Sequence, residues 1–281
     1  MIKINLKEIS FELALRANIN LRKDCERLIK KAYNRERKML PKQALGIILE
    51  NSKVAAKRRI PICQDTGLPV VFVRVPSNIS WEKKYSDSIK SGISMAYKKG
   101  GLRASAVYPF ADKTGFNPDI IHIEFSKGKT FSITVFPKGF GSENKSKLKM
   151  FNPTASKKDI SDFIIDSVKD AGPAACPPFF VGVGIGGTSD YALLLAKKAL
   201  LERVDKPNSD KPLRLWENKL LKQINSTGIG PMGLGGSFTA LSVKIKMHHT
   251  HIAGLPVGVN ISCHALRSAS FKTNVDNINI I

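Results

Sequence analysis

The sequence predicts an α/β protein in which N-terminal helices precede mixed β-sheets with flanking helices. Two observations predict this class. Apolar residues recur at helical spacing through the first part of the chain, and later segments combine short apolar runs with glycine-rich turns. The apolar fraction of 42% and the charged fraction of 24% are those of folded proteins, which excludes a disordered chain. Because we find neither an internal repeat nor a clear linker, we expect a single domain over residues 1–281.

The elements are expected in the following order. Helices come first, because apolar residues over 21–32 and 44–55 repeat every three or four positions. A loop over 61–67 leads into an apolar strand over 68–75, and the polar helix over 81–99 ends at two glycines. The other expected elements are strands over 120–125, 130–136, 179–183, 239–247 and 252–261, a loop over 138–144, and helices over 159–170, 190–201 and 216–224. The polar stretch 204–212 is the one place where two subdomains could separate.

The charge balance is strongly basic. The 45 Lys and Arg residues exceed the 23 Asp and Glu residues, which gives a formal net charge of +22. Such a surplus suits nucleic acid, anionic substrates or an acidic partner protein. The basic residues are dispersed, without zinc-finger spacing or an aromatic RNA-binding signature, so we expect no nucleic-acid partner. We also expect no membrane partner and a cytoplasmic protein, because the sequence has neither a long apolar run nor a secretory signal.

Three of the four cysteines stand beside turn-forming or polar residues. These are Cys63, Cys176 and Cys263, whereas Cys25 lies within a helical pattern. Reduced thiols on three separate turns could hold one metal centre, and thiolates favour zinc, copper(I) and iron–sulfur clusters. Paired C-x2-C spacing is absent, so burial as small apolar side chains remains an alternative. Three ligands would leave one iron of a four-iron cluster open to act as a Lewis acid.

Four polar residues are candidates for the chemistry around such a centre. Gln64 and Asp65 directly follow Cys63 and would lie next to the metal. Asp65 suits a proton shuttle, although capping its own turn is the plainer role. Arg103 could bind a carboxylate through its bidentate fork or be a surface charge. His251 taken alone is best explained as a hydrogen-bonded structural histidine at the start of a strand.

A glycine motif supports a competing function. Residues 182–187 fit G-x-G-x-x-G between an expected strand and an expected helix, and Glu202 and Asp205 follow near the spacing of a ribose-binding acid. A nucleotide-dependent oxidoreductase is therefore a second hypothesis. The glycine cluster at 228–236 weakens it, because glycine-rich turns recur along this chain. A basic nucleic-acid-binding protein with an iron–sulfur or zinc site is a third hypothesis.

Several long motifs resemble one family. They are ICQDTG (62–67), KGFGSEN (138–144), CPP (176–178), GVGIGGT (182–188), GIGPMGLGG (228–236), and THIAGLPV (250–257) through to the Cys-His pair at 263–264. In this order they resemble the iron–sulfur class I fumarate hydratases, and more narrowly the α subunit of the two-subunit fumarate hydratase/tartrate dehydratase group. The resemblance covers nearly the whole chain. It implies the Fe–S hydro-lyase α-subunit fold, equivalent to the N-terminal domain of the single-chain members.

The resemblance also implies a reaction, a cofactor and the residues that bind the cofactor and the substrate. The reaction would be the reversible dehydration of a small dicarboxylate, (S)-malate to fumarate and water, with L-tartrate dehydration as the alternative. A [4Fe-4S] cluster would be held by Cys63, Cys176 and Cys263. The substrate would meet Gln64, Arg103, Gly139, Gly141 and His251, with Asp65 as the catalytic acid/base on this chain.

The resemblance also implies a partner subunit, and the sequence departs from the family pattern at one position. The family places further catalytic groups in a second region that this sequence lacks, so a β subunit in an α2β2 assembly is the expected partner. Phe140 stands where many members carry glycine. A phenylalanine there would either narrow the substrate pocket or be neutral.

Overall fold

The computed structural model describes residues 2–116, 120–274 and 278–280, and its contacts group the chain into two compact units. Unit 1 consists of Met1–Arg22, Ser52–Gly139 and Arg267–Ile281. Unit 2 consists of Lys23–Asn51 and Phe140–Leu266. That the chain acts as one domain stays a prediction.

The polar stretch 204–212 does not separate two subdomains, so that expectation was wrong. It lies inside unit 2. Val204 is buried, and its backbone N–H donates to the Oδ2 atom of Asp24 over 3.0 Å. This bond fastens the start of the stretch to a helix far away in sequence.

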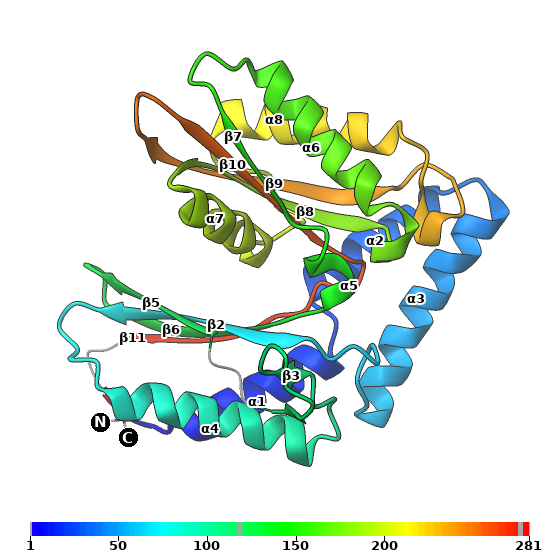
Figure 1. The fold of residues 1–281 in the computed structure, drawn as a ribbon. Helices are drawn as coiled ribbons and strands as arrows, with labels where there is room; N and C mark the ends of the chain where they lie inside the picture. Colours follow the sequence, from blue (N-terminus) through cyan, green and yellow to red (C-terminus); the bar gives the residue numbers. More distant parts are fainter. Residues whose placement is uncertain (1, 117–119, 275–277, 281) are drawn as a thin grey trace. The chain divides into compact units, whose positions relative to one another are not determined.

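Unit 1 is built on a four-stranded mixed sheet. Its elements are β1 (Ile2–Ile4), α1 (Leu6–Ile19), β2 (Leu68–Pro76), α4 (Lys83–Lys99), β3 (Ala106–Val107), β4 (Thr114–Gly115), β5 (Ile120–Ser126), β6 (Thr130–Lys138), β11 (Ala269–Asn274) and β12 (Ile278–Ile280). The sheet order is β11-β6-β2-β5, and β2 and β5 are its parallel pair. Helices α1 and α4 pack together along the sheet (Figure 1).

The alternation of side chains along β2 explains this packing. Val71, Val73 and Val75 are buried in the core that α1 and α4 share, whereas Phe72 and Arg74 between them are more exposed. The strands β5 and β6 are joined by a short turn, yet they do not form a hairpin. Each instead pairs with β2, one on either side.

Unit 2 is built on a second four-stranded mixed sheet. Its elements are α2 (Lys23–Arg35), α5 (Phe140–Glu143), β7 (Lys147–Phe151), α6 (Lys157–Ala171), η1 (Pro173–Ala175), β8 (Phe179–Gly187), α7 (Ser189–Leu201), α8 (Lys211–Asn225), η2 (Pro231–Gly233), β9 (Ala240–Thr250) and β10 (Leu255–Ser262), and α3 (Met39–Arg58) runs from this unit into unit 1. The sheet order is β7-β10-β8-β9, with β8 and β9 parallel. Helix α7 covers one face, and α6 and α8 cover the other (Figure 1).

The two mixed sheets with flanking helices, preceded by N-terminal helices, confirm the predicted α/β class. Within the described ranges, no helix combines the length and the apolar character that crossing a bilayer requires.

The glycine motif at 182–187 is part of strand β8, which runs on to Gly187, so the expected end of this strand at residue 183 was wrong. A Cβ atom on Gly184 would lie 2.0 Å from the backbone oxygen of Ala192 in α7. Gly258 pairs with Gly184 on the neighbouring strand, and a Cβ there would lie 2.8 Å from the same oxygen. The glycines therefore let a helix approach the sheet at backbone contact. This packing role replaces the phosphate-binding role, and with it the nucleotide-dependent oxidoreductase loses its supporting motif.

Candidate functional site

The loop that carries Cys63 lies in unit 1 between α3 and β2 and is fastened at both ends. At its start, the N–H of Ile62 donates to the backbone oxygen of Asn18 over 2.9 Å. At its end, the hydroxyl of Tyr97 lies 2.9 Å from the oxygen of Thr66 and 3.0 Å from that of the next residue. Cys63 itself is exposed. The thiol of Cys63 is thus exposed on a loop whose backbone is fixed by hydrogen bonds at both ends.

The hydroxyl of Tyr97 is suited to this fastening. The residue is buried, and burial raises the pKa of the Tyr97 hydroxyl well above its ordinary value. The group therefore stays protonated and donates to the loop carbonyls.

Asp65 uses its two carboxylate oxygens differently. Its Oδ1 atom accepts from the N–H of Gly67 over 3.0 Å, which is the turn-capping role expected from the sequence. Its Oδ2 atom faces Gly139, where a Cβ would lie only 3.1 Å away. The structure therefore brings together two of the predicted residues, Asp65 and Gly139. Proton transfer by Asp65 stays a prediction.

Two further predicted residues belong to the same region: Gln64 lies within the loop, and Arg103 is joined to it by a backbone hydrogen bond. The N–H of Arg103 donates to the Oγ1 atom of Thr66 over 3.0 Å, which ties the segment after α4 to the loop. The side chain of Arg103 is exposed, as is that of Gln64. Both side chains are accessible to an anion in solution, and their substrate contacts stay predictions.

In unit 2 the loops that carry Cys176 and Cys263 lie side by side. Cys176 follows η1 in a left-handed conformation with φ of 56°. The backbone N–H of His264 donates to the carbonyl oxygen of Cys176 over 3.2 Å, and the Nδ1 atom of His264 lies 3.1 Å from the same oxygen. Because a carbonyl only accepts, this geometry assigns a proton to Nδ1. His264 was not among the predicted site residues, although its position next to Cys263 was an available signal.

The two other predicted residues of unit 2 lie in short turns. His251 is exposed between β9 and β10, so its expected place at the start of a strand was wrong. Its Nδ1 atom accepts from the N–H of Ala253 over 3.1 Å. Gly141 lies in α5, a single helical turn where a loop was expected. Phe140, the first residue of that turn, is 46% exposed.

The donor set fits a thiolate-bound cluster in its chemistry. Cys63, Cys176 and Cys263 are all reduced and at least partly exposed, whereas Cys25 is fully buried. Soft thiolates of this kind are the ligands of iron–sulfur clusters. In the part of the chain that the structure describes, no three His, Cys, Asp or Glu side chains form a metal-holding group. The cluster and its three ligands stay predictions.

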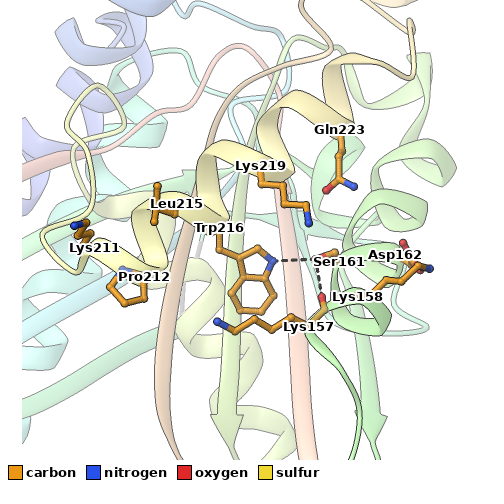
Figure 2. Close-up of a pocket in the computed structure, with 10 residues that line it drawn as sticks. All are labelled: Lys157, Lys158, Ser161, Asp162, Lys211, Pro212, Leu215, Trp216, Lys219 and Gln223. Carbon is orange, nitrogen blue, oxygen red and sulfur yellow. Dashed lines mark hydrogen bonds and ion pairs between the residues drawn. The ribbon is translucent and has the colours of Figure 1, made fainter.

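A groove of about 680 Å³ lies between α6 and α8 of unit 2 (Figure 2). Trp216 forms part of it, and its indole N–H donates to the hydroxyl of Ser161 over 2.9 Å. The ammonium of Lys157 lies 5.5 Å from the centre of the same ring. None of the predicted site residues lines this groove.

Comparison with known proteins agrees with the motifs. The profile of the family "Fumarate hydratase (Fumerase)" matches residues 7–272. A "Putative L(+)-tartrate dehydratase subunit alpha" of Methanocaldococcus jannaschii is 40% identical, over 97% of this chain and 99% of that protein. A "Putative fumarate hydratase class I" of Geobacillus stearothermophilus is 33% identical, over 93% of this chain but only 54% of that protein. The "L(+)-tartrate dehydratase subunit alpha" of Escherichia coli is 27% identical, over 88% of this chain and 84% of that protein. The chain belongs to the fumarate hydratase (Fumerase) family of hydro-lyases.

Proposed function

We propose that this protein is the α subunit of a [4Fe-4S]-dependent hydro-lyase that interconverts (S)-malate with fumarate and water. The observation that carries the proposal is the presentation of reduced, accessible thiols from fastened loops. The loops of Cys176 and Cys263 are joined through His264, and the loop of Cys63 is held at both ends beside Asp65. The family profile, which is that of fumarate hydratase, favours malate as the substrate.

The residues of this chain would divide the work as follows. When bound by the three thiolates, the cluster supplies a Lewis-acidic iron that makes the substrate hydroxyl a better leaving group. Arg103 and His251 would bind the two carboxylates and stabilise the negative charge that develops on one of them. Asp65 would hold or move a proton on its carboxylate, which the turn holds in place through the bond from Gly67 to Oδ1. The net charge of +22 would attract dianionic substrates.

Dehydration of L-tartrate is the second candidate reaction. It is favoured by the relative of Methanocaldococcus jannaschii, which matches end to end and is called a tartrate dehydratase subunit. Tartrate and malate are both hydroxylated four-carbon diacids, so the same carboxylate-binding residues suit either.

A β subunit is the proposed partner. Two of the relatives are called "subunit alpha", and the chain spans about half the length of the Geobacillus stearothermophilus relative. The β subunit would carry further catalytic groups, and an α2β2 assembly is our expectation.

The decisive experiment is anaerobic co-expression with the candidate β subunit encoded by the neighbouring open reading frame. We expect a brown complex that dehydrates malate, while this chain alone is inactive. Assays on L-tartrate in parallel separate the two candidate reactions. A complex that contains the cluster and turns over neither substrate would contradict the proposal.

The ligand set is tested by single serine variants of Cys63, Cys176 and Cys263. Each variant should lose iron and activity together, because serine replaces a soft thiolate with a hard, protonated oxygen. Cys25→Ser is the matched control and should retain iron, since Cys25 is fully buried. Full iron content in the three ligand variants would remove them from the site.

A further inference from the structure

We propose that Arg267 is a positioning residue that fixes the carboxylate of Asp65. This inference rests on the proposed function, in which Asp65 is the acid/base. Arg267 belongs to unit 1, together with Asp65 and Gly139. Neither the motifs nor the family resemblance assigned it a role.

Arg267 is a buried cation with few partners. Its side chain belongs to a residue that is only 3% exposed, and its Nη1 atom donates to Oδ1 of Asn18 over 3.2 Å. Its Nε atom is buried and has no acceptor. Among the residues that the structure describes, no ion pair joins Arg267 to a carboxylate. A buried charge without a bonded counter-charge is costly, and attraction to a nearby carboxylate would offset part of that cost.

The nearby carboxyl group is that of Asp65. A Cβ atom built on Gly139 would lie 3.1 Å from Nη2 of Arg267 and 3.1 Å from Oδ2 of Asp65. The Nη2 atom and the Oδ2 atom are therefore no farther apart than twice that distance, and both lie close to Gly139. With alanine at this position the methyl group would be in tight contact with both charged groups. The glycine thus lets both groups lie close to the backbone at residue 139, within the range of electrostatic attraction to each other.

Asn18 connects Arg267 to the backbone of the same loop. Its side-chain oxygen accepts from Arg267, and its backbone oxygen accepts from the N–H of Ile62, at the start of the loop. Arg267 consequently acts on the loop twice, by a hydrogen bond through Asn18 and by charge on Asp65. A purely structural residue would act only by the first route.

The first test is a double-mutant cycle on the unfolding of the full-length chain in urea, with Arg267→Gln and Asp65→Asn. Glutamine can still donate to Asn18, so this variant removes chiefly the charge. We expect the two substitutions to be non-additive by about threefold or more in the unfolding equilibrium constant, the range for residues that interact directly. Additive effects would overturn the proposal.

The control pairs Asp65→Asn with Arg16→Gln. Arg16 is an exposed arginine of α1 whose Nη2 atom donates to the backbone oxygen of Ser270 over 2.7 Å. This pair should be additive, because the side chain of Arg16 is exposed and bonds to the backbone of Ser270 in β11 rather than to Asp65. Coupling of similar size in the control pair would show that the signal is not specific to Arg267, and would also overturn the proposal.

The second test measures turnover of the α/β complex on malate and on L-tartrate. Arg267→Gln should retain iron and lower kcat by about tenfold to a hundredfold, the range for a misplaced catalytic group, with KM within about threefold of the wild type. Arg267→Lys should recover most of kcat, since it restores the charge. Wild-type kcat in Arg267→Gln would refute the inference. If the wild-type complex turns over neither substrate, the proposed function fails, and the unfolding cycle still decides the role of Arg267.

Discussion

The substitution Gly184→Ala tests whether the glycines of β8 serve helix packing. The new methyl carbon would lie 2.0 Å from the oxygen of Ala192 and 2.7 Å from the nitrogen of Ala196, both backbone atoms of α7. An ordinary contact begins near 3.4 Å, so the helix must move by more than an ångström. Forcing an extra methyl group into a packed core costs about 1–3 kcal/mol, and a backbone clash belongs at or above the upper end of that range.

Urea unfolding followed by tryptophan fluorescence measures this cost. The chain has two tryptophans, and Trp216 belongs to unit 2 while Trp81 belongs to unit 1. A Trp81→Phe background therefore reports on unit 2 alone. We expect Gly184→Ala to lower the free energy of unfolding of unit 2 by about 3 kcal/mol.

The matched control is Gly254→Ala, in a turn of the same unit. The nearest atom to its new methyl carbon would be the end of the Met150 side chain, at 3.9 Å. This variant should stay within about 0.5 kcal/mol of the wild type. Wild-type stability in Gly184→Ala would refute the packing argument and would revive a ligand-binding role for the glycine motif.

Two further predictions concern stability and loop order. Hydrogen bonds from Arg203, and then from Arg27, lower the pKa of Asp205 to about 2, so its stabilisation is present above about pH 4 and is lost as the pH falls toward 2. Because both arginines are more than half exposed, we expect Asp205→Asn to cost about 1–2 kcal/mol at pH 7, and urea unfolding should show this difference shrinking below pH 4. Tyr97→Phe removes the donor to the Cys63 loop, so hydrogen exchange over residues 63–67 should be faster and stability about 1–2 kcal/mol lower; unchanged exchange would contradict the fastening role.

Periodicity and turn residues were enough to locate most helices and strands, but not to pair the strands. The strands at 120–126 and 130–138 follow each other with a short turn, which is typical of a hairpin, yet both pair with β2. The edge strands β7 and β11 were missed. The residues of β7 are exposed except Phe151, and β11 carries only two apolar residues, Ala269 and Phe271, so neither segment has the continuous run of apolar residues on which such a prediction depends.

The sequence predicted those residues of the candidate site that have a distinctive local pattern, such as a cysteine beside turn-forming residues. Cysteines next to turns marked Cys63, Cys176 and Cys263, and the structure joins the last two loops through His264. Arg267 carried no such mark. Its significance comes from burial and from the proximity of Asp65, and both depend on contacts between segments far apart in the chain.

The interleaving of the two units has a consequence for biosynthesis. The chain passes from one unit to the other at 22/23, 51/52, 139/140 and 266/267. All of unit 2 is therefore synthesised before β11, an edge strand of the unit 1 sheet. Until β11 is added, strand β6 of this sheet has an unpaired edge, and exposed strand edges promote aggregation. For the same reason, no single cut in the polypeptide yields either unit intact.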